Sequence, residues 1–109
     1  TSENRRHIKS ALEYITDHYS EKISISEMAQ LAGFSENYFM SLFRQYVGMS
    51  CIQYVNHYRI QKAAHALEET TKSVSEIAMI HGFDNISYFN LQFRRTFGMT
   101  PREFRSKRK

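Results

Sequence analysis

The sequence predicts an all-α fold of seven helices, arranged as two helix-turn-helix units joined by a long linker helix. Three observations predict it. Apolar residues recur at helical spacing along most of the chain, and no alternating strand pattern competes with them. Only one proline and four glycines occur among the 109 residues. Capping boxes, in which a Ser or Thr hydroxyl and a Glu or Gln side chain satisfy backbone N–H groups reciprocally, stand at four predicted helix starts.

The first half of the chain is predicted to hold four helices. The first covers roughly 4–19, and its apolar residues at helical spacing are Ile8, Leu12, Ile15 and Tyr19. Short helices follow at about 25–32, after the capping box Ser24-Ile-Ser-Glu27, and at about 36–47. A long helix at about 51–68 starts at the box Ser50-Cys-Ile-Gln53. Its expected inward stripe is Ile52, Val55, Arg59, Ala63 and Leu67.

The second half adds three helices, at about 74–81, 85–97 and 101–106. The box Ser73-Val-Ser-Glu76 starts the first of them, and Thr100-Pro-Arg-Glu103 starts the last. Proline suits the first turn of a helix, as Pro101 does there. Gly48 and Gly98 each follow an aromatic-rich helix and are predicted to stop it in a left-handed conformation.

The chain repeats itself internally. The segment 25–34 matches 74–83 at a shift of 49 residues, and 38–54 matches 88–104 at a shift of 50. Each copy reads as a capped helix, a Gly-Phe turn, a second helix and a glycine stop, which is a helix-turn-helix. Helical hairpins also repeat in protein-binding solenoids, but two copies fall short of the three or so repeats that a solenoid needs.

The second helix of each unit offers a polar outward stripe. Phe39, Leu42, Phe43 and Tyr46 are expected to face inward in the first unit, and Phe89, Phe93, Thr96 and Phe97 in the second. The outward stripes are Asn37, Met40, Ser41 and Arg44, and then Ser87, Asn90, Leu91 and Arg94. Asn, Ser and Arg can bond base edges or phosphates in a major groove, and Met or Leu can touch a thymine methyl. One such stripe alone would favour a solvated face, whereas two equivalent stripes favour DNA binding.

These residues carry a family resemblance. The segments "ISEMAQLAGFSENYFMSLFRQYVGMS" and "GFDNISYFNLQFRRTFGMTPREFR" resemble the DNA-binding domain of AraC/XylS-type bacterial transcription regulators. The resemblance covers roughly residues 8–105. It implies that the helices at 36–47 and 85–97 enter successive major grooves on one face of double-stranded DNA. It also implies RNA polymerase as a partner, and an effector or dimerisation domain elsewhere in the full-length protein.

The expected organisation is a single DNA-binding domain over residues 1–109. Its parts are a first helix-turn-helix at about 24–48, a linker helix at about 50–68, a second helix-turn-helix at about 73–98, and a C-terminal helix with a basic tail at 100–109. The expected DNA-binding residues are Asn37, Met40, Ser41, Arg44, Ser87, Asn90, Leu91, Arg94 and Arg95. Family members often carry arginine at the positions of Ser41 and Leu91, so bidentate guanine contacts are not expected there.

Net charge supports this reading only weakly. The formal charge is +4, but residues 101–109 hold five basic residues and one acid, so the rest is balanced. Two alternative functions would also account for the positive charge. One is a helical protein-interaction module whose basic tail binds acidic partners, and the other is a basic helix that lies on a membrane surface. The first helix mixes acids into its polar face and lacks the Lys/Arg dominance of membrane-surface helices.

Other functional classes find no support in the sequence. No apolar run is long enough to predict a membrane span. The five histidines lack paired metal-ligand spacing, and a structural zinc site would use more cysteines than the single Cys51. No glycine-flanked nucleophile or phosphate-cradling loop occurs. We therefore predict no enzyme activity, no cofactor and no metal. A lone cysteine fits a reducing cytoplasm, which the resemblance implies is bacterial, and the missing initiator Met is expected of a fragment.

Overall fold

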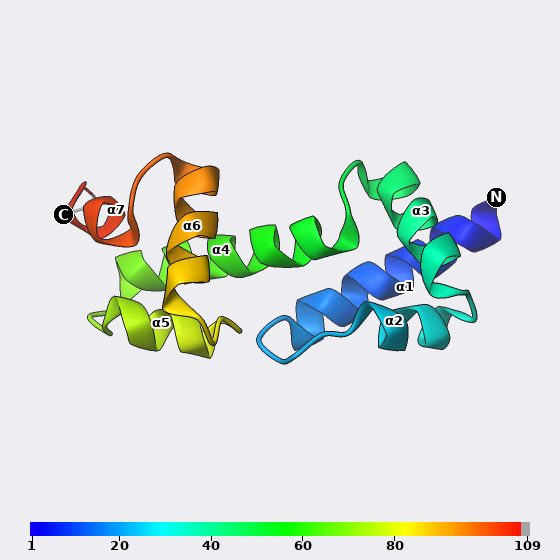
Figure 1. Cartoon of the computed structure of the whole chain (residues 1–109), viewed down its shortest axis with the longest axis horizontal. Helices are drawn as coiled ribbons and strands as arrows, with labels where there is room; N and C mark the ends of the chain where they lie inside the picture. Colours follow the sequence, from blue (N-terminus) through cyan, green and yellow to red (C-terminus); the bar gives the residue numbers. More distant parts are fainter. Residues whose placement is uncertain (108–109) are drawn as a thin grey trace. The chain divides into compact units, whose positions relative to one another are not determined.

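The computed structural model describes residues 1–107, and within them every regular element is a helix. The seven helices are α1 Ser2–His18, α2 Ile25–Ala32, α3 Glu36–Val47, α4 Cys51–Glu69, α5 Val74–Ile80, α6 Ile86–Phe97 and α7 Pro101–Lys107 (Figure 1). The predicted all-α fold of seven helices is confirmed, and each predicted boundary lies within two residues of the observed one. The end of the basic tail, Arg108 and Lys109, lies outside the described residues.

The chain forms two compact units, Thr1–Val55 and a second that begins at Asn56. The division falls inside α4, so this helix contributes to both units. Each unit has a buried hydrophobic cluster of its own. That residues 1–109 act as one functional domain stays a prediction.

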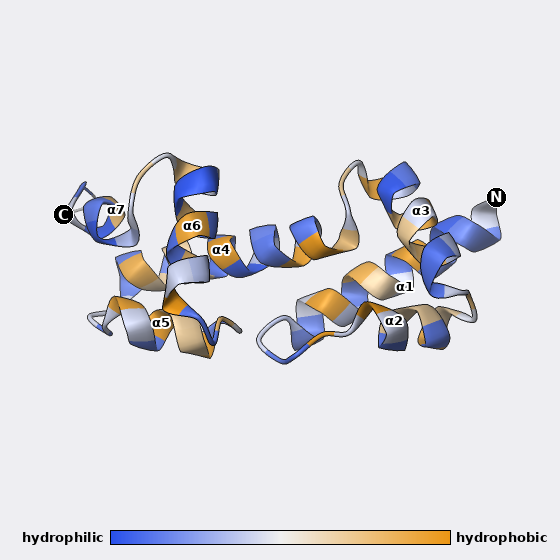
Figure 2. Ribbon diagram, viewed as in Figure 1, coloured by the Kyte–Doolittle hydropathy of each residue, from blue (hydrophilic) through white to orange (hydrophobic). Residues whose placement is uncertain are grey.

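The first unit packs α1, α2, α3 and the start of α4 around one core. Its amphipathic helices alternate hydrophobic and hydrophilic residues along the ribbon, as α1 shows in Figure 2. Phe39 and Phe43 of α3 are fully buried, with ring centroids 5.9 Å apart. The rest of the buried cluster is Ile8, Ala11, Ile15, Met28, Ala29, Leu42, Cys51 and Val55. Burying two phenylalanines fixes which face of α3 points inward, because each hides a large apolar area from water.

The second unit builds a similar core from α4, α5, α6 and α7. Phe93 of α6 is fully buried and has three aromatic neighbours, at centroid distances of 5.8 Å to Phe89, 4.9 Å to Phe97 and 5.4 Å to Phe104. The buried cluster is Ile60, Ala63, Ala64, Leu67, Ile77, Ala78, Phe83, Phe89 and Phe93. The predicted equivalence of Phe43 and Phe93 as buried anchors is confirmed.

Helix starts and ends follow the predicted signals, but two of the four predicted capping boxes are not reciprocal. At Ser73 the Glu76 N–H donates a 3.1 Å bond to the serine hydroxyl, and among the described residues the Glu76 carboxylate returns none. Gly48 and Gly98 end α3 and α6 at φ 90° and 73°, a left-handed region that glycine adopts without steric cost. Reciprocal capping boxes form at Ser50–Gln53 and Thr100–Glu103, with all four bonds between 2.9 and 3.1 Å. In the box at Ser24, the Glu27 carboxylate instead accepts a 3.0 Å bond from the Tyr14 hydroxyl.

The internal repeat extends further than the sequence pattern indicated. Three residues of α1 have counterparts of the same type in α4 at a shift of 52 residues: Asn4 and Asn56, Ile8 and Ile60, Ala11 and Ala63. Both isoleucines and both alanines are buried. The linker helix α4 is therefore also the first helix of the second unit. It supports α6 in the way that α1 supports α3.

The predicted inward stripe of α4 is partly wrong. Val55, Ala63 and Leu67 are buried, but Ile52 is 57% exposed. At the start of α4 the helix presents Cys51 and Val55 to the first core, and Ile52 lies beside them on the solvent side. The fully buried residue that the stripe omits is Ile60, which belongs to the second core.

Cys51, at the start of α4, is a small buried residue with 2% exposure. Burial raises the pKa of its thiol to about 12. Because the thiolate is the reactive form, alkylation at pH 8 should be slower than that of a free cysteine by about a thousandfold. Iodoacetamide labelling followed by mass spectrometry checks this, with the denatured chain as the control. Rapid labelling of the native protein would contradict the burial of Cys51.

Two further observations bear on function. No helix among residues 1–107 is both long and apolar enough to cross a membrane. In the same residues, no three His, Cys, Asp or Glu side chains gather in a way that could hold a metal ion.

Candidate nucleic-acid interface

The outward stripes of α3 and α6 lie on the surface, as their spacing predicts. Met40 is 38% exposed and Leu91 is 47% exposed. The other members of the predicted set are exposed as well: Asn37, Ser41, Arg44, Ser87, Asn90, Arg94 and Arg95. Each stripe therefore offers polar and basic groups together with one apolar side chain to solvent.

In the first unit, α3 is held by a cap at its start and a core at its back. The Ser35 hydroxyl accepts a 3.2 Å bond from the Tyr38 N–H, which satisfies a backbone donor that the helix leaves open. The Tyr38 hydroxyl accepts a 3.3 Å bond from the Asn4 side chain of α1. With Phe39 and Phe43 buried behind it, α3 has a fixed rotation about its own axis, so its outward stripe is fixed too.

The second unit holds α6 by the same contacts. Asn85 caps the helix by accepting a 3.0 Å bond from the Tyr88 N–H. This cap explains why α6 begins at Ile86, one residue later than predicted. The Tyr88 hydroxyl accepts a 2.8 Å bond from Asn56 of α4. Tyr38 and Tyr88 are equivalent residues, and so are the asparagines that bond them.

A second pair of contacts supports the turn in each unit. The His7 ring meets Phe34 edge-on at a centroid distance of 5.2 Å, and the Arg59 guanidinium lies 5.9 Å from the ring centroid of Phe83. His7 and Arg59 are 52 residues apart, like the other α1–α4 counterparts. Burial lowers the pKa of Arg59, against the opposing influence of Tyr88 and Asp84. Arg59 therefore supports the turn that positions α6.

A groove lies beside α6 in the second unit. It has a volume of about 500 Å³, and residues of α5, α6 and α7 line its walls. Asn90 and Arg94 of the outward stripe line it together with Ser75 of α5 and Arg102 of α7. Arg102 is not among the predicted DNA-binding residues, because the basic residues after Pro101 were assigned to the C-terminal helix and its basic tail.

The two units together define a class of protein. Each has a capped first helix, a turn closed by a buried or half-buried phenylalanine, and a second helix that shows a polar and basic stripe to solvent. This is a tandem helix-turn-helix domain.

Comparisons with known proteins agree. Residues 28–107 match the family described as a helix-turn-helix domain. The chain is 34% identical over 91 residues to the probable transcriptional regulator LumQ of Photobacterium leiognathi, covering 84% of this chain and 37% of LumQ. It is 31% identical over 105 residues to the transcriptional activator RhaS of Enterobacter sp. (strain 638), covering 96% of this chain and 38% of RhaS. The chain thus spans less than two fifths of the length of these relatives.

Solved structures give the same result. A transcriptional regulator from Chromobacterium violaceum with an AraC-type DNA-binding domain is 28% identical, with a TM-score of 0.86 covering 99% of this chain and 96% of that one. The DNA-binding domain of AdpA, solved in complex with a target DNA, is 26% identical, with a TM-score of 0.87 covering 92% and 90%. The chain belongs to the AraC/XylS-type helix-turn-helix family of DNA-binding transcription regulators.

Proposed function

We propose that this chain binds double-stranded DNA in a sequence-specific way through α3 and α6, each reading one half-site in a major groove, and so regulates bacterial transcription. The observation that carries the proposal is the equivalence of the two outward stripes. Each is exposed, each is held by the same cap, tyrosine and phenylalanine contacts, and each contains an asparagine and an arginine. An α-helix fits the major groove, and these side chains suit base edges and phosphates.

The remaining parts of the proposal concern the whole protein. RNA polymerase is the expected partner, and an effector or dimerisation domain is expected elsewhere in the full-length chain. We place the protein in the cytoplasm, where the DNA is, and assign it a binding role without enzymatic chemistry.

The salt dependence of binding tests the proposal. If Arg44, Arg94 and Arg95 contact phosphates, binding releases counterions, and the association constant should fall steeply as salt rises. A log–log slope of about −3 to −7 is expected for a handful of neutralised phosphates. Fluorescence anisotropy against labelled duplex measures it, with anionic vesicles as the comparison. A slope near zero, or tighter binding to vesicles than to duplex, would reject DNA as the partner.

Substitutions in the stripes should separate base contacts from phosphate contacts. Arg44→Ala or Arg94→Ala should weaken binding to all sequences alike and flatten the salt slope by about one. Asn37→Ala or Asn90→Ala should cost about 1–3 kcal/mol on the preferred site only. Leu91→Ala should reduce the preference for thymine at one position, because the methyl group loses its apolar partner.

These variants should leave stability within about 0.5 kcal/mol of the parent, because the side chains are exposed in the free protein. Thermal unfolding provides this control. Binding-site selection from a random duplex library gives the preferred sequence for each variant. If Asn37→Ala and Asn90→Ala both leave the selected sequence unchanged, neither asparagine reads a base.

A further inference from the structure

The groove beside α6 differs in charge from the matching surface of the first unit. Two arginines, Arg94 and Arg102, line it, and none of its lining residues is acidic. Both arginine side chains are exposed. Two like charges that border one groove favour an anion between them.

Hydrogen-bond donors accompany these charges. Ser75 of α5 and Thr100, just before α7, bring hydroxyl groups to the groove, and Asn90 brings a side-chain amide. Hydroxyls, amides and guanidinium groups are the side-chain groups that hold phosphate oxygens in protein–DNA complexes. The volume of about 500 Å³ also falls in the range of about 300–1,000 Å³ in which proteins hold small ligands.

The first unit lacks this combination at its equivalent positions. The repeat at a shift of 50 aligns Ile52 with Arg102 and Gln45 with Arg95. It aligns Glu36 with Ile86 and Met40 with Asn90. Ile52 is 57% exposed and uncharged where its counterpart carries a guanidinium group.

The local charge balance follows from these differences. Over residues 86–103, from the start of α6 into α7, three arginines, Arg94, Arg95 and Arg102, stand against the single acid Glu103. Over the equivalent residues 36–53 of the first unit, one arginine, Arg44, stands against one acid, Glu36. The Glu103 carboxylate is itself engaged, because it accepts a 2.9 Å bond from the Thr100 N–H.

We propose that the groove formed by α5, α6 and α7 binds a phosphodiester segment of the DNA strand that flanks the α6 half-site, with Arg102 as a phosphate ligand. The second unit then supplies the greater share of the electrostatic affinity, and the first unit binds its half-site with fewer phosphate contacts. This inference rests on the proposed function, since it needs α6 to lie on DNA.

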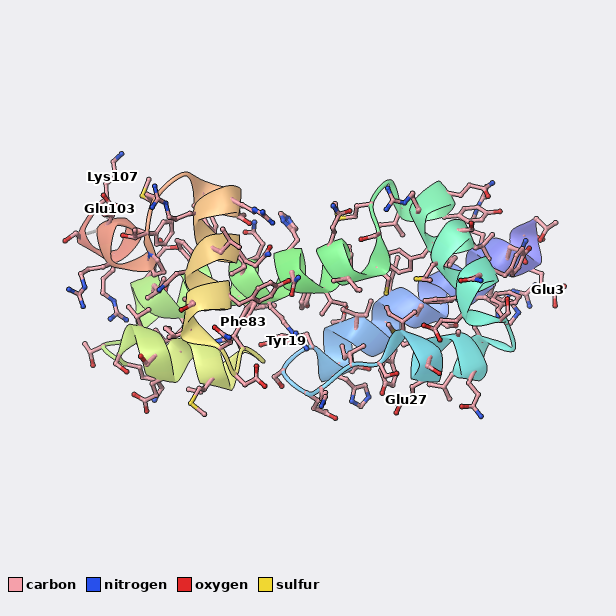
Figure 3. All side chains as sticks on the ribbon, in the orientation of Figure 1. Glu3, Tyr19, Glu27, Phe83, Glu103 and Lys107 are labelled. Atoms are coloured by element: carbon pink, nitrogen blue, oxygen red, sulfur yellow. The ribbon has the colours of Figure 1, made fainter. Side chains whose placement is uncertain are left out.

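Arg102→Ala tests the inference, with Lys107→Ala as the matched control. Both residues are exposed cations on α7, but Lys107 (labelled in Figure 3) lines a different hollow, with Gly98 and Glu103. For Arg102→Ala we expect a salt slope flatter by about one and an affinity about fivefold to tenfold lower at 100 mM salt. For Lys107→Ala we expect no change in slope. If both variants lose the same affinity and the same salt slope, the basic residues of the tail act through bulk charge. That result would contradict the proposal that the groove binds phosphate.

A gain of binding provides the reciprocal test. Ile52→Arg places a second arginine on the first unit at the position equivalent to Arg102, and Ile52 is exposed enough to be replaced without disturbing the core. We expect the salt slope to steepen by about one. No change in slope would show that this position does not face phosphate in either unit.

Neutral phosphates locate the contact on the DNA. Methylphosphonate groups, placed one at a time along both strands, remove single charges from the duplex. At one position beside the α6 half-site, the substitution should cost the parent protein about the same factor as Arg102→Ala does. The same substitution should not lower the affinity of the Arg102→Ala protein further, because both changes remove the same contact and their effects are then not additive.

The outcomes separate the two proposals. If the parent binds duplex with a steep salt slope and every methylphosphonate position weakens Arg102→Ala as much as the parent, the DNA-binding function stands and the groove proposal fails. If the parent itself shows no salt-dependent binding to duplex, both fail. Thermal unfolding of Arg102→Ala confirms that any loss of affinity comes from a folded protein.

Discussion

Replacing Phe93 by alanine is expected to destabilise the protein by about 3–5 kcal/mol, because it empties a large, fully buried site. Phe93 shows no exposed surface, and its ring touches those of Phe89, Phe97 and Phe104. Small domains are stable by only about 5–15 kcal/mol, so the loss is a large fraction of the total. The melting temperature should fall by more than about 12 °C.

Phe43→Ala should cost a similar amount in the first unit, where the ring lies 5.9 Å from Phe39 and 5.8 Å from Tyr54. Leu91→Ala is the matched control for Phe93→Ala, since it removes a large apolar side chain from the outer face of the same helix. It should cost less than about 0.5 kcal/mol. Differential scanning calorimetry measures all three. An unchanged melting temperature for Phe93→Ala, or equal losses for Phe93 and Leu91, would mean that α6 faces the other way.

Much of this fold was predictable because its signals are local. A Ser or Thr followed three residues later by Glu or Gln marks a helix start without any knowledge of the tertiary structure, and Gly48 and Gly98 mark two helix ends. The inward and outward faces of α3 and α6 followed from 3.6-residue spacing, since both helices bury one face only.

The equivalence of α1 and α4 was not predictable in the same way. It follows a shift of 52 residues, whereas the segments after it align at 49 and 50, so a single shift does not reveal it. Its most informative pair differs in residue type: His7 and Arg59 both support a turn phenylalanine, one as an aromatic ring and one as a cation. Only the packing brings out the shared role.

Ile52 and Arg102 show the limit of periodicity most clearly. Spacing alone put Ile52 on the inward stripe of α4, because that stripe continues correctly through Val55 and Ala63. The repeat offered the corrective signal, since it aligns Ile52 with a charged residue that would not be buried alone. Arg102 was missed for a related reason: a basic residue near a chain end looks solvated until three helices are seen to form a groove beside it.

We propose that α3 and α6 read two half-sites at once. Two helix-turn-helix units that bind one face of a duplex need half-sites about one helical turn apart, roughly 34 Å. Inserting about five base pairs between the half-sites turns one of them to the opposite face of the duplex. We expect the protein to lose one of its two contacts on such a site, because the two half-sites then face opposite sides of the duplex.

The measurement is a competition titration on the selected site, with insertions of zero, five and ten base pairs. Affinity for the five-base-pair insertion should fall to that of a duplex with one half-site destroyed. On this duplex, the asparagine that reads the lost half-site no longer contributes. Its replacement, Asn37→Ala or Asn90→Ala, should therefore not lower the affinity further. The ten-base-pair insertion returns both half-sites to the same face of the duplex but moves them further apart. It therefore separates the effect of rotation from the effect of distance. If affinity for the five-base-pair insertion stays equal to that for the original site, only one of the two helices reads DNA, which contradicts binding through two half-sites.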